Sequence, residues 1–256
     1  APYASFISPS RYMRPIKISL VSLGNLKYPL NVSELEAWQS DVLSIQHGAS
    51  VGHLPDSDGG SWEYTDDQLL KVLAADDTSD FTVGLINVPL EDNYYMRRLT
   101  DKVAVLSLNE MAEIIHYSEF TLEQYVLRNL YELAVLFAAN GKLIPSDYAT
   151  WAHDKVRGCL FDMNSSKSDI VFSLHRPKLC SACKTRVSSK QVPADFVPTL
   201  ERELLRIQKT LFVRMIEWVK LHPIFALIIT ATSGVLLNLI ASIIFEKAKR
   251  VLPWLG

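Results

Sequence analysis

The chain has 256 residues, of which 48% are hydrophobic, and this is enough for one large domain or two small ones with a buried core. Its formal net charge of −2 argues against a dedicated nucleic-acid binder, because such proteins usually carry a clear basic excess. We therefore expect a globular protein that does not bind nucleic acid directly.

The first twenty residues give no sign of a secretory signal, because no uninterrupted apolar segment follows a basic one there. We therefore expect the N-terminal domain to lie in the cytosol. Thiols stay reduced in that compartment, and clustered cysteines there bind metal more often than they form disulfides.

Mixed strand and helix patterns fill the region 1–187, which we predict to be one soluble domain. Apolar, β-branched runs predict strands, and segments with apolar residues every three or four positions predict helices. These elements predict an α/β fold with a mixed sheet and helices. In chain order they are strand 15–23, helix 68–75, strands 80–90 and 102–111, and helix 121–140.

An aromatic and basic cluster, Tyr94, Tyr95, Arg97 and Arg98, lies between the last two predicted strands. Such a cluster could bind a phosphate or a loop of a partner protein. A structural surface turn is the alternative, and the more common one. We keep the four residues as candidates for partner binding.

The predicted helix 121–140 contains the sequence RNLYELAVLFA, and a lone cysteine followed about twenty residues later by C-x-x-C comes after it. In this order of motifs, the region 80–187 resembles archaemetzincins, small zinc metallopeptidases of the metzincin class. In that family a HExxHxxGxxH helix precedes a set of cysteines that ends in C-x-x-C. The resemblance implies a metzincin-like fold for the soluble domain.

The resemblance also places residues of this chain at the positions of the catalytic motif. Tyr131 stands at the first histidine, Glu132 at the general-base glutamate and Val135 at the second histidine. A metzincin needs both histidines on one helix face to hold zinc, and the glutamate then takes a proton from the bound water. With both histidines replaced, we expect this chain not to be an enzyme. A membrane-tethered zinc metallopeptidase with other ligands is the alternative.

A second metal site is predicted behind this helix, where Cys159, Cys180 and Cys183 supply three thiolates. We expect His153 to be the fourth ligand, because three cysteines and one histidine are an ordinary set for structural zinc. The alignment to the family points instead to Asp154. Three unmetallated buried thiols are the remaining alternative. A zinc held in this way would stabilise the fold.

A charge-free apolar run of 23 residues, 223–245, predicts one transmembrane helix, because a helix of that length crosses a hydrocarbon core of about 30 Å. A linker, 188–198, and an amphipathic helix, 199–222, precede it, and a short tail, 246–256, follows. The amphipathic helix would pack on the soluble domain, lie in the membrane interface or bundle with copies of itself. More cations precede the span than follow it, which favours a cytosolic N-terminal domain.

Small and polar residues occur inside the predicted span. Such residues let helices approach closely and form hydrogen bonds with one another, and an asparagine near mid-membrane is costly unless it is paired. We therefore expect self-association, with a tolerated asparagine in a monomeric anchor as the alternative. The residues are Thr230, Ser233, Gly234, Asn238 and Ser242.

These features together predict a membrane protein with two roles. Its peptidase-like domain would bind a protein partner or a signal, and its transmembrane helix would perturb the lipid bilayer as an effector. This layout resembles that of membrane effectors in prokaryotic antiviral defence, although function does not follow from architecture. A passive tail-anchored adaptor is the alternative.

Overall fold

The computed structural model describes residues 14–251 apart from 61, 148–149, 155 and 165, and leaves the side chains of 248–251 undescribed. The chain divides into two compact units, Ala1–Gln208 and Lys209–Gly256. Two sequence predictions fall partly outside the described residues. They are the absence of a secretory signal in residues 1–20 and the tail 246–256.

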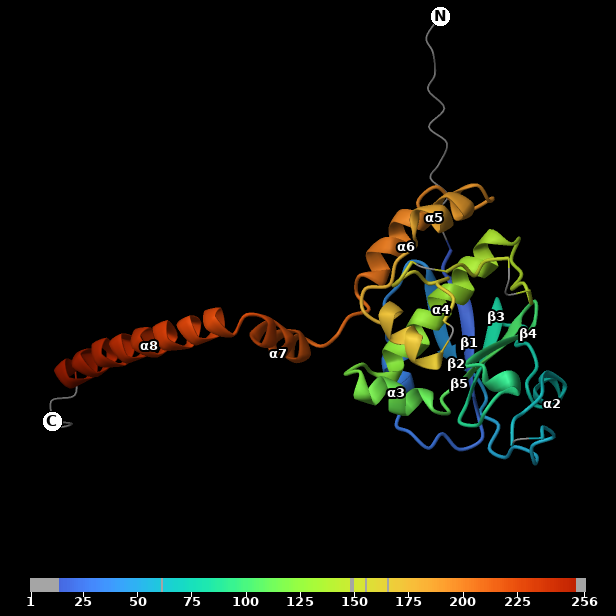
Figure 1. The fold of residues 1–256 in the computed structure, drawn as a ribbon, viewed down its shortest axis with the longest axis horizontal. Helices are drawn as coiled ribbons and strands as arrows, with labels where there is room; N and C mark the ends of the chain where they lie inside the picture. Colours follow the sequence, from blue (N-terminus) through green and yellow to red (C-terminus); the bar gives the residue numbers. More distant parts are fainter. Residues whose placement is uncertain (1–13, 61, 148–149, 155, 165, 252–256) are drawn as a thin grey trace, which may run out of the picture. The chain divides into compact units, whose positions relative to one another are not determined.

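A five-stranded sheet in the order β2-β1-β3-β5-β4 forms the centre of the first unit (Figure 1). The first four of these strands run parallel to one another, and β4 is antiparallel to β5. The mixed sheet that the sequence predicted is therefore present. The strands are β1 (Ile16–Leu23), β2 (Leu43–His47), β3 (Phe81–Ile86), β4 (Met96–Thr100) and β5 (Val103–Ser107).

The three predicted strands, 15–23, 80–90 and 102–111, are β1, β3 and β5 in the middle of the sheet. Their apolar runs fit this place, because a central strand is covered on both faces. All six residues of β3 are buried. The two strands that the sequence did not reveal, β2 and β4, lie at the edges and mix polar with apolar residues.

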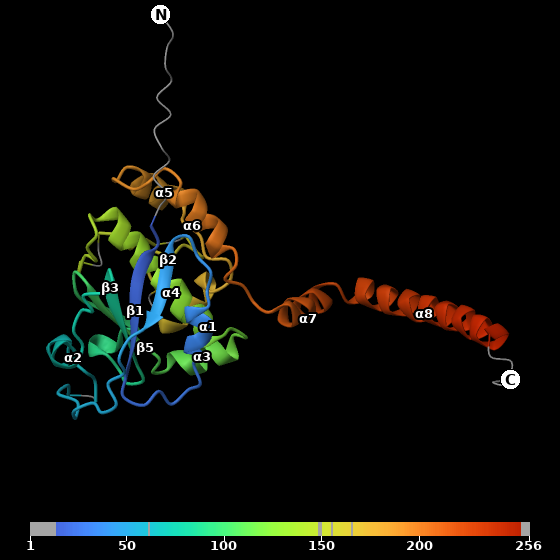
Figure 2. The same ribbon diagram turned by 180° about the vertical axis from the view of Figure 1, so that it is seen from behind.

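The helix α4 (Leu122–Ala139) lies against one face of the sheet in Figure 1 and in the view from behind in Figure 2. A capping box formed by Thr121 and Gln124 starts it. Its apolar side chains pack on the sheet, and the rings of Phe137 and Phe81 lie 5.5 Å apart. The predicted helix 121–140 is therefore the main helix of the core.

The other face of the sheet has a smaller core of its own. Val21 and Leu23 of β1 and Val105 of β5 point to it, whereas Ile18 and Leu20 point to the α4 side. The helix α2 (Asp66–Val72), which the sequence predicted at 68–75, covers this second face through Leu69. The alternation of β1 thus divides its apolar residues between two layers of helices.

Short helices complete the first unit. Apart from α6, which falls partly in the predicted helix 199–222, the sequence did not predict them, because each has fewer than ten residues and shows too few turns for a periodic pattern. They are α1 (Val32–Glu36), α3 (Met111–Tyr117), α5 (Ser181–Ser188), α6 (Phe196–Leu204) and the 3₁₀ helices η1 (Glu91–Asn93) and η2 (Lys167–Ser173).

The soluble domain ends later than predicted. We expected its end at 187, followed by a linker at 188–198. Instead α6 belongs to the first unit, and its residues Phe196, Leu200 and Leu204 are buried in the main core. The proline-containing segment is thus part of a folded region, because the apolar residues that follow it pack on α4 and the sheet.

The second unit contains α7 (Leu211–Leu221) and α8 (Pro223–Val251). The predicted amphipathic helix 199–222 is therefore two helices, α6 and α7, and α6 lies in the other unit. Within the described chain, one helix is long and apolar enough to cross a membrane, Pro223–Lys247, with 25 residues and a mean hydropathy of 2.2. None of its apolar stretch is buried.

Candidate metal centre and adjoining pocket

Two segments of the first unit bring the four predicted metal ligands together. His153 and Cys159 lie on the connection between α4 and η2. A backbone bridge pairs Cys159 with Lys178, two residues before Cys180. Cys180 caps the N-terminus of α5, and Cys183 lies in its first turn. The short spacing of C-x-x-C thus places both thiols at one helix end.

The geometry of this cluster fits zinc. All four ligand atoms lie within 4.8 Å of one another. Cys159 Sγ is 3.9 Å from Cys183 Sγ, and Cys180 Sγ is 3.5 Å from His153 Nε2. A tetrahedral zinc with Zn–S bonds of about 2.3 Å and Zn–N bonds of about 2.0–2.1 Å requires separations of about 3.8 Å and 3.6 Å. The expected zinc cofactor therefore has a place that it can occupy.

The fourth member of the cluster is His153 and not Asp154. The side chain of Asp154 is exposed, and it does not belong to the group. Cys159 and Cys183 are buried, and His153 and Cys180 are half-buried. Four protein ligands leave no open coordination position, which is typical of a structural zinc site.

Hydrogen bonds in the cluster already favour a thiolate. The backbone N–H of Cys180 donates to Cys159 Sγ, and the sulfur atoms of Cys159 and Cys183 share a second hydrogen bond. The bond with Cys183 is the main cause that lowers the pKa of Cys159 to about 5, and the same bond raises the pKa of Cys183. Metal binding would release the protons that remain on the thiols, because only thiolates bind zinc.

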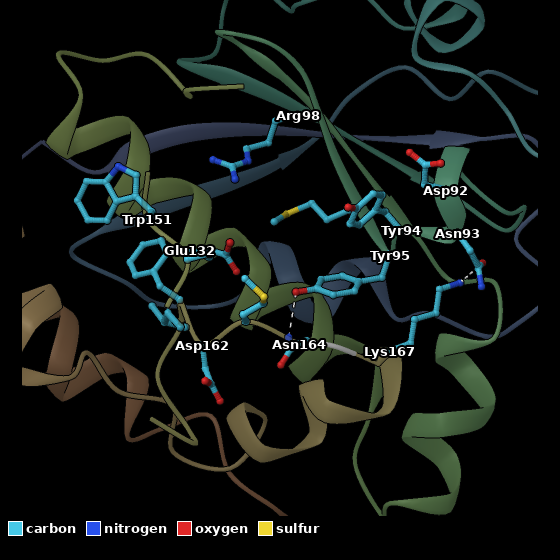
Figure 3. A pocket seen from close by; sticks show the side chains of 15 residues that line it. Asp92, Asn93, Tyr94, Tyr95, Arg98, Glu132, Trp151, Asp162, Asn164 and Lys167 are labelled. Atoms are coloured by element: carbon cyan, nitrogen blue, oxygen red, sulfur yellow. Dashed lines mark hydrogen bonds between the residues drawn. The ribbon is translucent and has the colours of Figure 1, made fainter. Parts of the chain in front are cut away.

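A pocket of about 590 Å³ lies beside the metal-binding connection. Its aromatic lining comes from Tyr94 and Tyr95 on one side and from Trp151 and Phe161 on the other, with 5.0 Å between the latter two rings. Figure 3 shows Glu132 projecting from its helix into the space between these groups. The pocket thus combines an aromatic lining with charged groups at its wall, among them the carboxylates of Asp92, Glu132 and Asp162.

The residue before Glu132 faces a different neighbour. Tyr131 is buried, donates a hydrogen bond to Glu203 of α6 at 2.7 Å and accepts one from Nε1 of Trp38 at 2.8 Å. Burial raises the pKa of Tyr131, so its hydroxyl stays protonated. Val135 is buried in the core. The two positions that the resemblance equates with histidines thus hold α4 to its surroundings.

Glu132 itself is held by an ion pair with Arg128, one helical turn earlier. The side chain of Arg128 is 1% exposed and also donates to Ser173 at 3.0 Å and to the carbonyl of Leu160. Leu160 lines the pocket. The ion pair of Arg128 and Glu132 therefore connects α4 to the segment that contains His153 and Cys159. Glu132 is a buried, hydrogen-bonded residue.

The predicted aromatic and basic cluster is divided in the structure. Arg97 and Arg98 are neighbours in β4, so their side chains point to opposite faces. Arg97 pairs with Asp66 at 2.6 Å, and its guanidinium lies 5.5 Å from the ring centre of Tyr94. Arg98 is buried, donates to the carbonyl of Pro145 and lines the pocket. Tyr94, Tyr95 and Arg98 share the pocket, whereas Arg97 does not line it.

Sequence reasoning missed the rest of the pocket wall. Trp151, Phe161 and Met163 had no motif to mark them, and they become neighbours of Tyr95 only through the fold. One signal was present. Trp151 and Phe161 each lie two residues from a predicted metal ligand, His153 and Cys159, and a zinc site fixes the chain near its ligands.

No protein-family model and no curated protein matches the chain. Among solved structures, the crystal structure of archaemetzincin from Methanopyrus kandleri is similar, with 16% sequence identity and a TM-score of 0.46. The similarity covers 69% of this chain and 95% of that one. This match agrees with the predicted archaemetzincin-like fold and concerns the fold alone.

The expectation that this chain is not an enzyme is contradicted. The described residues contain a group able to bind a metal, formed by His153, Cys159, Cys180 and Cys183. The expectation relied on Tyr131 and Val135, which are no ligands. The absence of histidine at these two positions removes one metal site, but it does not exclude enzymatic activity. The cluster of His153 and three cysteines nevertheless differs from the histidine set of a catalytic metzincin zinc.

Proposed function

We propose that this chain is a membrane-anchored zinc protein whose first unit binds a partner or a signal and whose α8 acts in the bilayer. The exposed apolar surface of α8 is the main support for this proposal. None of the 23 residues of its charge-free apolar stretch, 223–245, is buried, and such a surface is costly in water. At 1.5 Å per residue this stretch reaches about 35 Å, which is enough to cross a hydrocarbon core of about 30 Å.

The zinc site supports the first unit as a stable binding domain. The cluster connects the segment of His153 and Cys159 to α5. Zinc would therefore fix the wall of the pocket that carries Trp151 and Phe161. A volume of about 590 Å³ lies within the range of about 300–1,000 Å³ that is usual for ligand sites. We propose that the pocket receives the apolar group of a partner or signal molecule.

A polar row on α8 supports self-association. Thr230, Gly234, Asn238 and Ser242 recur every fourth residue and share one helix face, whereas Ser233 lies beside this row, about 60° from Thr230. The Thr230 hydroxyl donates to its own helix at Ala226.

Asn238 is the residue of this row that requires a partner. Its amide makes no hydrogen bond to any other described residue. Nothing lies within 4 Å of the position where a Cβ of Gly234 would be, so a second helix could approach there. An amide at mid-membrane is stabilised by a hydrogen bond to a second helix. A second copy of α8 would supply the same amide.

Associated copies of α8 would bring polar groups into the hydrocarbon core and disturb the bilayer. The combination of a binding unit and such a helix supports an effector role in prokaryotic antiviral defence. The cations before the span outnumber those after it, which supports a cytosolic first unit.

The test is to express the full chain in a bacterium and to record growth and membrane potential with a potential-sensitive dye. Truncation after His222 removes α8 and leaves α6 and α7 in place. We expect depolarisation from the full chain only, and its loss in Asn238→Leu and Gly234→Leu. Ile229→Leu, on the helix face opposite the polar row, is the matched control and should behave as the parent chain.

Membrane fractionation of the same cells separates the parts of the proposal. A full chain that stays in the soluble fraction would refute anchoring. Anchoring without depolarisation, in cells that also contain any required partner, would leave the passive tail-anchored adaptor as the function. Equal depolarisation by the Asn238→Leu variant would refute assembly through the polar row.

A further inference from the structure

The helix α7 has an apolar face that stays largely exposed. At about 100° per residue, the members of this face fall within an arc of about 160°. Leu211, Phe212 and Met215 are 69%, 71% and 58% exposed, and no residue of α7 is buried. The face comprises Leu211, Phe212, Met215, Ile216, Trp218 and Val219.

The remaining face of α7 carries the charges. Arg214, Glu217 and Lys220 lie there, and Lys209, just before the helix, pairs with Glu217 at 2.5 Å. Three cations and one anion give this segment a formal charge of +2. A helix with an apolar arc and a cationic arc matches the boundary between acyl chains and anionic headgroups.

The position of α7 in the second unit indicates which surface it meets. Only His222 separates it from α8, which starts at Pro223. The rings of Trp218, His222 and Phe225 form a continuous series, with centroid distances of 5.5 Å and 6.3 Å. The end of α7 is therefore held at the level where the apolar span begins. That level is the headgroup region, where tryptophan rings are favoured.

We infer that α7 is an interfacial helix that binds the surface of an anionic phospholipid bilayer. Its apolar face lies on the acyl chains, and Arg214 and Lys220 extend to the lipid phosphates. This inference rests on the proposed insertion of α8. A second copy of α7 could also cover the apolar face, but it would bring two cationic segments together, whereas anionic lipid neutralises them.

The experiment uses the full chain reconstituted in vesicles of phosphatidylcholine alone or mixed with phosphatidylglycerol. Hydrogen exchange reports the protection of the backbone amides 211–221. The fluorescence of Trp218 is obtained as the difference between the parent chain and Trp218→Phe. Quenching of this fluorescence by brominated acyl chains reports the depth of Trp218 in the bilayer. We expect α7 amides to exchange about tenfold more slowly in the mixed vesicles than in a Phe212→Glu, Met215→Glu double variant.

Two further variants separate the causes. Arg214→Gln with Lys220→Gln should lose the additional protection in mixed vesicles and behave in both lipids as the parent does in phosphatidylcholine. Val213→Gln, on the charged face, is the matched control and should leave the protection unchanged.

Flotation with the vesicles measures anchoring separately. A chain that does not float refutes the proposed function itself. A chain that floats while its α7 amides exchange as fast as those of the double variant refutes the interfacial helix alone. Protection without quenching of Trp218, together with cross-links between α7 segments, would assign the apolar face to a second copy and also overturn the inference.

Discussion

The hydroxyl of Tyr131 provides a direct test of how the first unit is held together. Replacement with phenylalanine removes one oxygen and leaves the ring in the core. The hydroxyl's two short hydrogen bonds are lost, the one donated to Glu203 at 2.7 Å and the one accepted from Trp38 at 2.8 Å, together with a longer contact of 3.4 Å to Ser40. A buried bond to a charged group contributes about 1.5–3 kcal/mol, and a neutral one about 0.5–1.5 kcal/mol. We therefore expect Tyr131→Phe to lower the free energy of unfolding by about 2–4 kcal/mol.

The assay is urea unfolding of the full chain in detergent micelles, followed by near-ultraviolet circular dichroism. Tyr28→Phe is the matched control, because Tyr28 also donates to a carboxylate, Glu113 at 3.2 Å, but at the exposed surface. It should change the free energy of unfolding by less than about 0.5 kcal/mol. If Tyr131→Phe costs no more than this control, α4 is not held to α6 through Tyr131, and the account of this position is wrong.

Three further changes test other parts of the structure. Cys180→Ser should reduce bound zinc, measured by mass spectrometry of the metal, from one ion per chain to well below one, and a chelator should lower the melting temperature of the parent more than that of the variant. Glu132→Gln leaves the charge of Arg128 buried without its counter-charge and should cost about 3 kcal/mol in the same unfolding assay, whereas unchanged stability would contradict a buried pair. In Gly84→Ala the new Cβ would lie 2.7 Å from Leu73, so we expect a loss of about 1–3 kcal/mol, with intact secondary structure by far-ultraviolet circular dichroism.

Local pattern predicted the elements that are covered on all sides. The strands β1, β3 and β5 and the helix α4 have apolar sequences long enough to show their period. The metal cluster was also predictable, because three cysteines and a histidine are few in number and have one common chemistry. The choice of His153 over Asp154 needed only the usual composition of a structural zinc site.

Other features depend on contacts that no local pattern contains. Tyr131 and Glu203 are 72 residues apart, and neither sequence context indicates the other. The end of the soluble domain was placed too early for a related reason. The apolar spacing of Leu200 and Leu204 resembles that of Leu211 and Met215, but the first pair is buried in the core and the second is exposed. Periodicity shows that a helix has an apolar face and does not show what covers it.

The connection that carries the metal ligands has a consequence for regulation. Trp151, Leu160 and Phe161 line the pocket, and His153 and Cys159 of the same short segment face the metal cluster. One stretch of backbone is therefore ordered by two different binding events. By thermodynamic linkage, each event that orders this stretch lowers the entropic cost of the other, and the effect is equal in both directions. Zinc in the cluster would then raise the affinity of the pocket, and a molecule bound in the pocket would raise the affinity for zinc by the same factor.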